Sequence, residues 1–260
     1  MKPSNSLLGI LGGLGPMSSA YFYELITEHT YATCDQDHID IIISSRATTP
    51  DRTAFITGQS YDDPLPIMVD EVQRLTGAGA TIIAMPCNTA HYFYYSLCDV
   101  CSVPILNIIS LTVQYAAHIG ARSIGIMATE GTIRTEAYKK ICDAYNIKCV
   151  IPSCESQKLL SSIIYDSIKH GETVPDTNGF KRVSDELVYA GCDSLILGCT
   201  ELSLIKRVYP INEIYIDSLD VLAACAIASC GKKLRKYPAT LMDFAQKHCL
   251  SERNVNNDSQ

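Results

Sequence analysis

The segment Thr76-Gly-Ala-Gly-Ala-Thr-Ile-Ile-Ala-Met-Pro-Cys-Asn-Thr89 is followed 112 positions later by Val188-Tyr-Ala-Gly-Cys-Asp-Ser-Leu-Ile-Leu-Gly-Cys-Thr-Glu201, which has the same pattern. Each segment has a glycine where a helix would end, then a short apolar run, and then a cysteine with polar neighbours. A second match aligns residues 7–15 with residues 123–131 at an offset of 116. Two matches at nearly one offset indicate a duplicated α/β unit, with chance similarity between buried strands as the alternative.

Short apolar runs alternate with runs of helical spacing along the chain. Strands are expected at 7–11, 39–44, 81–85, 105–108, 123–127, 148–151, 194–197 and 214–216. Helices are expected at 18–31, 65–77, from about 90, and at 111–119, 133–145, 157–170, 180–190 and 217–235. Ser18 or Ser19 should cap the first helix, and Asp217 or Ser218 the last. This alternation predicts an α/β fold with mostly parallel sheets flanked by helices.

The repeat divides the chain into two pseudo-symmetric lobes. We expect residues 1–112 together with 217–235 to form lobe one, and residues 113–216 to form lobe two. Residues 236–260 are then a C-terminal extension, polar and loosely held from 254 onward. Because ligands of open parallel sheets bind beyond the carboxyl ends of the strands, the site is expected in the cleft between the lobes.

The composition limits the class of protein. The 260 residues are 47% hydrophobic and 19% charged, which excludes intrinsic disorder as the whole answer. The net charge of −7 and the lack of a basic stripe argue against nucleic acid and anionic membranes as partners. No apolar run approaches the roughly 20 residues that span a bilayer, and residues 7–14 resemble a strand more than a signal peptide. We therefore expect a cytoplasmic protein with reduced thiols.

Twelve cysteines are scattered along the chain without the spacing of a disulfide framework. Cys192, Cys225 and Cys230 lie in apolar runs, where a thiol behaves as a small hydrophobe. Cys98 and Cys101 form the single C-x-x-C pair, and no second pair follows at zinc-ribbon spacing. A metal site is therefore disfavoured relative to ordinary core or surface thiols.

Cys87 and Cys199 are different, because each follows a repeated strand and is followed at once by polar residues. If the two lobes face each other, the two thiols approach one cleft from opposite sides. A thiolate can then remove a proton from one face of a stereocentre while a thiol supplies one to the other face. The pKa of a free cysteine, about 8.5, makes both protonation states accessible. The alternative is that both are structural thiols.

Five short motifs resemble, in order and in spacing, the cofactor-independent aspartate/glutamate racemase superfamily and, within it, the aspartate racemases. They are Gly12-Gly-Leu-Gly-Pro16, Pro50-Asp-Arg-Thr53, Pro86-Cys-Asn-Thr-Ala-His91, Ala128-Thr-Glu-Gly-Thr132 and Gly198-Cys-Thr-Glu-Leu202. The resemblance runs from about residue 7 to residue 235. It implies two pseudo-symmetric lobes, an acidic amino acid as substrate, no pyridoxal phosphate or metal cofactor, and a homodimer.

Carried over residue by residue, the resemblance makes Cys87 and Cys199 the two catalytic thiols. Arg52 would meet the side-chain carboxylate of the substrate, and Lys169 would close over the substrate from a mobile segment. The α-carboxylate and α-amino group would be held by Asn88, Thr89, Thr129, Thr132 and Thr200. The pairs Ser18-Ser19 and Arg134-Thr135 depart from the usual pattern, which leaves the chemistry intact but affects the expected substrate range.

Several of these residues also have ordinary structural explanations. Arg52 could be a surface arginine in a loop, and Lys169 could compensate a helix dipole at a C-terminus. His91 is better explained as a helix-start or core histidine than as a base. Glu201 could orient Thr200 or a thiol, or equally cap a helix in solvent. The turn at 12–15 lacks the full dinucleotide pattern and a P-loop lysine, which disfavours nucleotide binding.

The sequence therefore predicts an enzyme that interconverts L- and D-aspartate, with glutamate as a further candidate. The mechanism has no electron sink, so donors must face the α-carboxylate in a closed cleft. Helix N-termini after the two cysteines should favour the thiolates. The enzymatic alternatives are maleate isomerisation and hydantoin racemisation on the same scaffold. The others are a non-catalytic amino-acid-binding or thiol-sensing protein and a zinc- or thiol-buffering protein.

Overall fold

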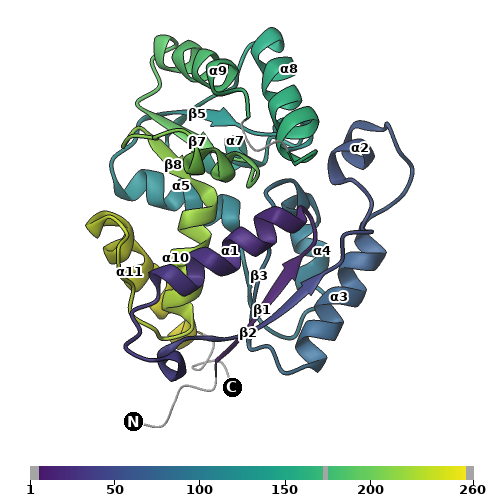
Figure 1. Cartoon of the computed structure of the whole chain (residues 1–260), viewed down its shortest axis with the longest axis vertical. Helices are drawn as coiled ribbons and strands as arrows, with labels where there is room; N and C mark the ends of the chain where they lie inside the picture. The colour runs from purple at the N-terminus through teal and green to yellow at the C-terminus, as the bar shows by residue number, and fades with distance from the viewer. Residues whose placement is uncertain (1–5, 172–174, 256–260) are drawn as a thin grey trace.

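Two separate four-stranded sheets form the frame of the protein, seen in a computed structural model that describes residues 6–171 and 175–255 (Figure 1). The first sheet has the order β2-β1-β3-β4 and the second the order β6-β5-β7-β8, and neighbouring strands are parallel throughout. The strands are β1 (Leu7–Gly12), β2 (Asp40–Ser45), β3 (Ile82–Ala84), β4 (Ile105–Leu106), β5 (Ser123–Met127), β6 (Lys148–Val150), β7 (Ser194–Leu197) and β8 (Tyr215–Asp217).

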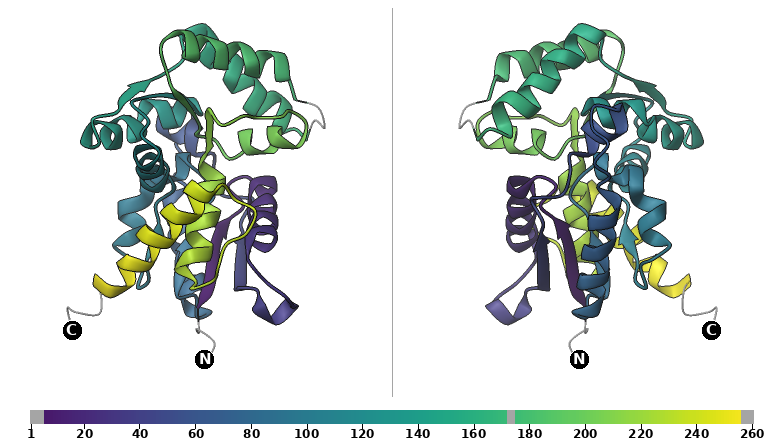
Figure 2. Two further views of the ribbon diagram at one scale, coloured as in Figure 1. Left: turned by 90° about the vertical axis from the view of Figure 1, so that its left-hand side faces the viewer. Right: turned by 90° about the vertical axis from the view of Figure 1, so that its right-hand side faces the viewer.

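The two sheets have the same topology, because β5 to β8 repeat the order of β1 to β4. Figure 2 shows them as two lobes, one above the other, each with helices against its sheet. The predicted fold class, an α/β protein of two lobes with parallel sheets, is therefore confirmed. The strands that carry the repeated segments, β3 and β7, hold the same third position in their sheets.

Lobe one is built on the β1–β4 sheet. Its helices are α1 (Pro16–His29), η1 (Asp35–Asp37), α2 (Arg52–Thr57), α3 (Leu65–Gly77), η2 (Thr89–Phe93) and α4 (Tyr94–Cys98). The helix α3 shows why these segments fold as they do: Met68, Val72 and Leu75 follow helical spacing and are all buried against the sheet. The three residues of β3 are buried as well, as expected for a strand covered on both faces.

Lobe two is built on the β5–β8 sheet. The helix α5 (Ile108–His118) leads into it across the expected lobe boundary at 112. The other helices of lobe two are α6 (Glu130–Arg134), α7 (Ala137–Ala144), α8 (Cys154–Ser162), the π-helical turn η3 (Ile163–Ile168), α9 (Thr177–Tyr189) and η4 (Leu202–Arg207). One face of this sheet packs through Leu195 and Leu197 against Val183 and Leu187 of α9. The opposite face joins a core that continues into lobe one through α5 and α10.

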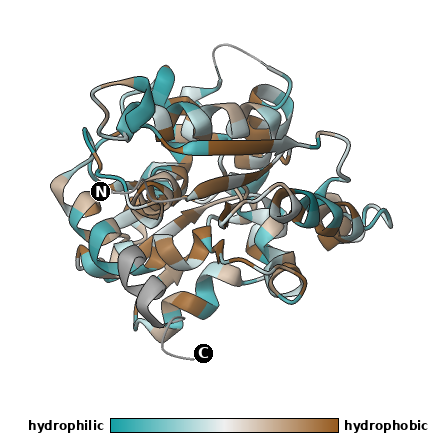
Figure 3. Ribbon diagram, turned by 90° about the horizontal axis from the view of Figure 1, so that it is seen from below, coloured by the Kyte–Doolittle hydropathy of each residue, from teal (hydrophilic) through white to brown (hydrophobic). Residues whose placement is uncertain are grey.

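The helix α10 (Ser218–Ser229) ties the lobes together. It begins where β8 ends, with Asp217 as the N-cap, and packs against α1, α5 and the last helix, α11 (Ala239–Val255). Every residue of α10 except Asp220 is buried, which explains why it is hydrophobic all round. Figure 3 shows the same segregation for the whole molecule, with hydrophobic strands inside and hydrophilic helix faces outside.

The C-terminal extension contains a helix that the sequence analysis did not predict. Residues 239–255 form the helix α11, in which Leu241, Phe244 and Ala245 are buried against the core shared by α5 and α10. The extension is therefore anchored by apolar contacts, and the tail expected from 254 onward falls mostly on residues 256–260, which lie outside the described residues. No described helix has the length and apolar character that crossing a membrane requires.

Helix boundaries account for most of the wrong local predictions. Ser18 and Ser19 do not cap α1, which starts at Pro16, and Ser19 instead accepts the Gly13 N–H from inside the helix at 3.0 Å. The helix expected at 133–145 is split into α6 and α7 by Glu136, whose φ is +52°. The helix expected to reach 235 ends at Ser229, since the following segment turns back and pairs with the end of α1 through the N–H of Tyr31.

Candidate active site

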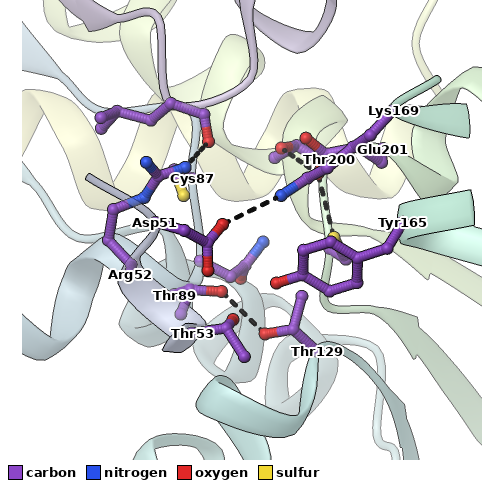
Figure 4. Close-up of a pocket in the computed structure, with 13 residues that line it drawn as sticks. Asp51, Arg52, Thr53, Cys87, Thr89, Thr129, Tyr165, Lys169, Thr200 and Glu201 are labelled. Carbon is purple, nitrogen blue, oxygen red and sulfur yellow. Dashed lines mark hydrogen bonds and ion pairs between the residues drawn. The ribbon is translucent and has the colours of Figure 1, made fainter. Parts of the chain in front are cut away.

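The carboxyl ends of β3 and β7 meet at one buried cavity between the lobes. Cys87 follows β3 and Cys199 follows β7, and both line this cavity with 6% and 4% of their surface exposed. The two strand ends touch directly, because the Thr200 hydroxyl donates to the Pro86 carbonyl at 3.2 Å. The cavity is lined by residues of both lobes (Figure 4): Leu14, Asp51, Arg52, Thr53, Cys87, Asn88, Thr89, Thr129, Tyr165, Lys169, Cys199, Thr200 and Glu201.

The residues expected to hold the substrate's α-groups lie close together. Three threonine hydroxyls form a triangle across the lobe boundary: Thr89 lies 2.8 Å from Thr129 and 3.0 Å from Thr132, and Thr129 and Thr132 are 3.1 Å apart. Thr132 does not line the cavity, but it supports the two threonines that do. Their hydroxyl hydrogens can reorient, so the triangle can present donors to an anion in the cavity.

The lobes approach each other very closely beside this triangle. Gly131 of α6 has no room for a side chain, because an added Cβ would lie 3.0 Å from the Thr53 Cα and 3.0 Å from the Thr89 methyl group. The glycine therefore lets α6 of lobe two press against α2 of lobe one. This contact closes one side of the cavity.

Asn88 is held firmly by both lobes. Its Nδ2 donates to the Ser218 hydroxyl at 3.0 Å, and its Oδ1 accepts the Tyr138 hydroxyl at 2.6 Å. The amide is therefore fixed in orientation, with one N–H left to face the cavity. Tyr138 was not expected from the sequence, and it links Asn88 to α7.

Arg52 is not a surface arginine, because only 6% of it is exposed at the start of α2. Three backbone carbonyls accept from its terminal nitrogens: those of Thr49, Pro50 and Leu14, at 3.3, 2.9 and 2.5 Å. Its Nε is buried and has no hydrogen-bond partner among the described residues. A buried, unpaired guanidinium N–H is costly unless an anion completes it, so this edge suits a carboxylate.

Lys169 reaches the cavity from the end of η3 in lobe two. Its Nζ lies 3.5 Å from Asp51 Oδ2 of lobe one and 4.1 Å from the centre of the Tyr165 ring (Figure 4). Burial alone would lower the pKa of Lys169, but the surrounding Glu201, Tyr165, Cys199 and Asp51 outweigh it and raise the pKa. The raised pKa therefore keeps Lys169 charged in the cleft.

The pKa values of both thiols are raised, which favours the protonated form of each. Burial raises the pKa of Cys87, with Glu201 adding to it and the Arg52 guanidinium opposing it. Burial raises the pKa of Cys199 further, helped by the charge of Glu201 and by the hydrogen bond to it. Backbone N–H groups at the starts of the short helices η2 and η4, those of Ala90 and Glu201, lower the two thiol pKa values as expected, but burial outweighs them and the net shift is upward.

His91 is a core histidine, as expected. Its Nδ1 lies 2.8 Å from the Cys87 carbonyl, and its Nε2 accepts the Ile108 N–H at 3.1 Å. Burial lowers its pKa to about 4, so the ring is neutral and ties the end of β3 to the start of α5. Cys98 and Cys101 are partly buried, and no group of three metal-ligating side chains occurs in the part of the chain described.

Sequence reasoning missed four residues that line the cavity: Leu14, Asp51, Thr53 and Tyr165. Asp51 and Thr53 flank Arg52, so their place in that motif was an available signal. Tyr165 stands four residues before Lys169, which puts the two side chains on one helical face. Burial raises the pKa of Tyr165 to about 12, which keeps its hydroxyl protonated beside the lysine.

Comparisons with known proteins show which family the chain resembles. The family model described as Asp/Glu/Hydantoin racemase matches residues 11–226. The broad-specificity amino-acid racemase RacX of Bacillus subtilis (strain 168) is 27% identical over 229 residues, covering 86% of this chain and 97% of the relative. The structure of Picrophilus torridus aspartate racemase is 30% identical, with a TM-score of 0.76, and covers 89% of this chain and 97% of that one.

A more distant structure shares the fold. Glutamate racemase from Francisella tularensis, solved in complex with D-glutamate, is 16% identical with a TM-score of 0.61, covering 95% of this chain and 94% of that one. The family match covers most of the chain, including both cysteines. The protein therefore belongs to the Asp/Glu/hydantoin racemase family of isomerases.

Proposed function

We propose that the protein racemises aspartate, with glutamate as a second candidate substrate, through Cys87 and Cys199 and without pyridoxal phosphate or metal. The observation that carries the proposal is the cavity itself. Two thiols from corresponding strand ends line one small space, together with an unpaired guanidinium N–H and the ammonium group of Lys169, whose side chain is 26% exposed.

In the proposed reaction, one thiolate removes the Cα proton and the opposite thiol donates a proton to the other face. The configuration inverts, and the two sulfurs exchange protonation states at each turnover. Thr89, Thr129, Thr200 and the free Asn88 N–H are proposed to bind the α-carboxylate and α-amino group, with Thr132 in support. Hydrogen bonds to the carboxylate stabilise the charge that develops at Cα, and a closed cavity strengthens them.

The acidic side chain of the substrate is assigned to Arg52 and Lys169. The Nε edge of Arg52 can accept a carboxylate in a planar, bidentate geometry. Lys169 is already paired with Asp51, so a substrate carboxylate would compete with Asp51 for the ammonium group. The buried cation of Arg52 and the partly exposed cation of Lys169 favour an aspartate or glutamate side chain over a neutral one. The 30% identity to an aspartate racemase supports this choice.

The decisive experiment is racemisation in D₂O. Purified protein and L-aspartate should give D-aspartate by chiral chromatography, with deuterium at Cα by mass spectrometry. A panel of glutamate, alanine, maleate and a 5-substituted hydantoin distinguishes the other reactions of this scaffold. Absence of both D-aspartate and deuterium would reject aspartate racemisation, and aspartate binding by calorimetry without exchange would indicate a binding protein.

We also propose a cytoplasmic homodimer, and lobes at residues 1–112 with 217–235 and 113–216, followed by the extension 236–260. Light scattering of the purified protein tests the dimer, and cell fractionation tests the location. Limited proteolysis tests the lobe boundaries, since cleavage inside a lobe rather than near its limits would contradict them.

A further inference from the structure

Lobe two contains a second cavity that is separate from the thiol cavity. This cavity, called the α7 cavity below, has a volume of about 230 Å³ and is lined by residues of β5, β6, α6 and α7. Among the described residues, none lines both cavities. Glu136 and Lys139 border the α7 cavity with side chains that are more than half exposed, so small molecules can reach it from solvent.

Two residues of the α7 cavity also support the candidate active site. The Thr132 hydroxyl belongs to the threonine triangle, where it lies 3.0 Å from the Thr89 hydroxyl. The Tyr138 hydroxyl donates to Asn88 Oδ1 at 2.6 Å, and Tyr138 is only 2% exposed. A change in the α7 cavity can therefore alter the groups proposed to hold the substrate, without touching Cys87 or Cys199.

A pair of thiols lies at this cavity. Cys149 lines it from β6, the edge strand of the second sheet, and is partly buried. Cys142 of α7 is fully buried in the core against which Cys149 packs, and a hydrogen bond links the two side chains. One thiol is therefore open to a molecule in the cavity, and the other lies directly behind it.

The electrostatic surroundings make the two thiols unequal. The hydrogen bond from Cys142 lowers the pKa of Cys149, and the Lys139 cation adds to this, against burial and the charges of Asp143 and Glu136. The same hydrogen bond, together with burial, raises the pKa of Cys142. Since the thiolate is the nucleophile, Cys149 is the reactive member of the pair.

The C-x-x-C pair lacks this inequality. Burial is the largest influence on both Cys98 and Cys101, and it raises the pKa of each. The pair that the sequence pattern singles out is therefore less suited to thiol chemistry than the pair that the fold brings together.

The helix α7 connects the thiol pair to Asn88. Cys142 follows Tyr138 by four positions, which places the two side chains on one face of the helix. Both side chains are buried on that face. A displacement of Cys142 therefore acts on the helical turn that carries the Tyr138 hydroxyl.

We propose that Cys149 is a modification site for small disulfides, with Cys142 as the resolving thiol, and that its oxidation loosens the hold of Tyr138 on Asn88. The Cys149 thiolate attacks one sulfur of a disulfide R–S–S–R, forms a mixed disulfide and releases one RS⁻. The Cys142 thiol then loses its proton and attacks the Cys149 sulfur, which releases the second RS⁻. Two protein thiols are oxidised to one disulfide, and the small disulfide is reduced to two RSH, which take up the two thiol protons.

The effect on activity rests on the proposed function. A disulfide holds its two sulfurs about 2.05 Å apart, which is closer than two hydrogen-bonded thiols. Bond formation therefore draws α7 and β6 together and shifts Tyr138. Asn88 then loses the hydrogen bond that fixes its amide on that side.

The chemistry is tested without turnover. Reduced protein is incubated at neutral pH with 2-hydroxyethyl disulfide, quenched with acid, digested and analysed by mass spectrometry without reduction. The wild type should give a Cys142–Cys149 disulfide, and Cys142→Ala should stop at a mixed disulfide on Cys149. The exposed Cys154 is the internal control and should react at least about tenfold more slowly than Cys149.

Two outcomes of this experiment would overturn the proposal. One is a Cys149 that reacts no faster than Cys154, and the other is a wild type that accumulates the mixed disulfide at Cys149 without passing it to Cys142. Circular dichroism checks that Cys142→Ala and Cys149→Ala are folded.

The effect on the site is tested by racemisation after the same treatment. Oxidised wild type should lose about tenfold in kcat/KM for aspartate, as expected for one lost hydrogen bond, and dithiothreitol should restore it. Cys149→Ala keeps Cys87 and Cys199 and should resist the treatment. Equal losses in the wild type and in Cys149→Ala would place the effect elsewhere and overturn the link to Asn88. If the disulfide forms and the reduced protein shows no racemisation, the proposed function fails while the modification site stands.

Discussion

The ends of β3 and β7 occupy the same position in two sheets of the same order and carry the same side chain, yet their surroundings differ. Cys87 is followed by Asn88, whose amide is held by Ser218 and Tyr138, and it lies near the Arg52 cation. Cys199 is followed by Thr200 and by a carboxylate that accepts its thiol hydrogen. The shared topology therefore accounts for where the two sulfurs lie, and the neighbours that differ between the lobes give the two thiols different electrostatic surroundings.

Replacing each thiol tests the feature that the two lobes have in common, a cysteine at the end of the third strand. We expect Cys87→Ala and Cys199→Ala each to lower kcat for aspartate by about 10²- to 10⁴-fold, because each removes one proton-transfer group. Cys192→Ala is the matched control, since it removes a buried thiol of lobe two that does not line the cavity. Racemisation rates of the three variants check this, and near-normal turnover by either site variant would contradict the two-thiol assignment.

Replacing Lys169 tests the charge that lobe two contributes to the site. Lys169→Gln should lower kcat/KM for aspartate by about 10- to 100-fold, as expected for the loss of a hydrogen bond to a charged group. Turnover of alanine, if present, should change much less. Lys181→Gln is the control, because Lys181 is exposed on the surface of α9 and forms an ion pair with Asp185. An equal loss of kcat/KM for aspartate and alanine would show that Lys169 does not contact the substrate side chain.

The pH dependence sharpens the difference between the thiols. Burial raises both pKa values, so at neutral pH little of the base thiolate exists in the free enzyme. The logarithm of kcat/KM should rise with pH at a slope near one, roughly tenfold from pH 7 to pH 8, as the base thiol loses its proton. Steady-state kinetics with aspartate measure this slope. A flat profile between pH 6 and pH 8 would mean that the base has an ordinary or lowered pKa.

Adding one methyl group at Gly131 tests whether the close contact between the two lobes matters for activity. Gly131→Ala should push α6 away from α2 and lower kcat/KM several-fold, because the added methyl has to displace the Thr53 backbone or the Thr89 side chain. Gly77→Ala is the control, since nothing lies within 4 Å of its added Cβ at the end of α3. Thermal melting separates an opened cleft from an unfolded protein. Equal activity of the two variants would show that close contact between the lobes is not needed.

Most elements could be predicted from periodicity, because buried strands and amphipathic helices leave a local pattern. Predictions failed where tertiary contacts override that pattern. The capping by Ser18 and Ser19 failed because the helix starts earlier, at Pro16, and Ser19 binds the preceding turn instead. The helix α11 was missed because Leu241, Phe244 and Ala245 make sense as an apolar face only against α5 and α10.

The candidate site was predictable to the extent that its residues stand in short motifs. The sequence by itself determined the α/β alternation, the duplication, and the two cysteines at equivalent strand ends, since these depend on local spacing and on repetition. Only the tertiary structure decided that Arg52 is buried with one N–H unpaired, that Tyr138 reaches Asn88, and that Glu201 accepts the thiol hydrogen of Cys199. Burial and the charges of distant neighbours set these properties, and both arise only when the two lobes close on each other.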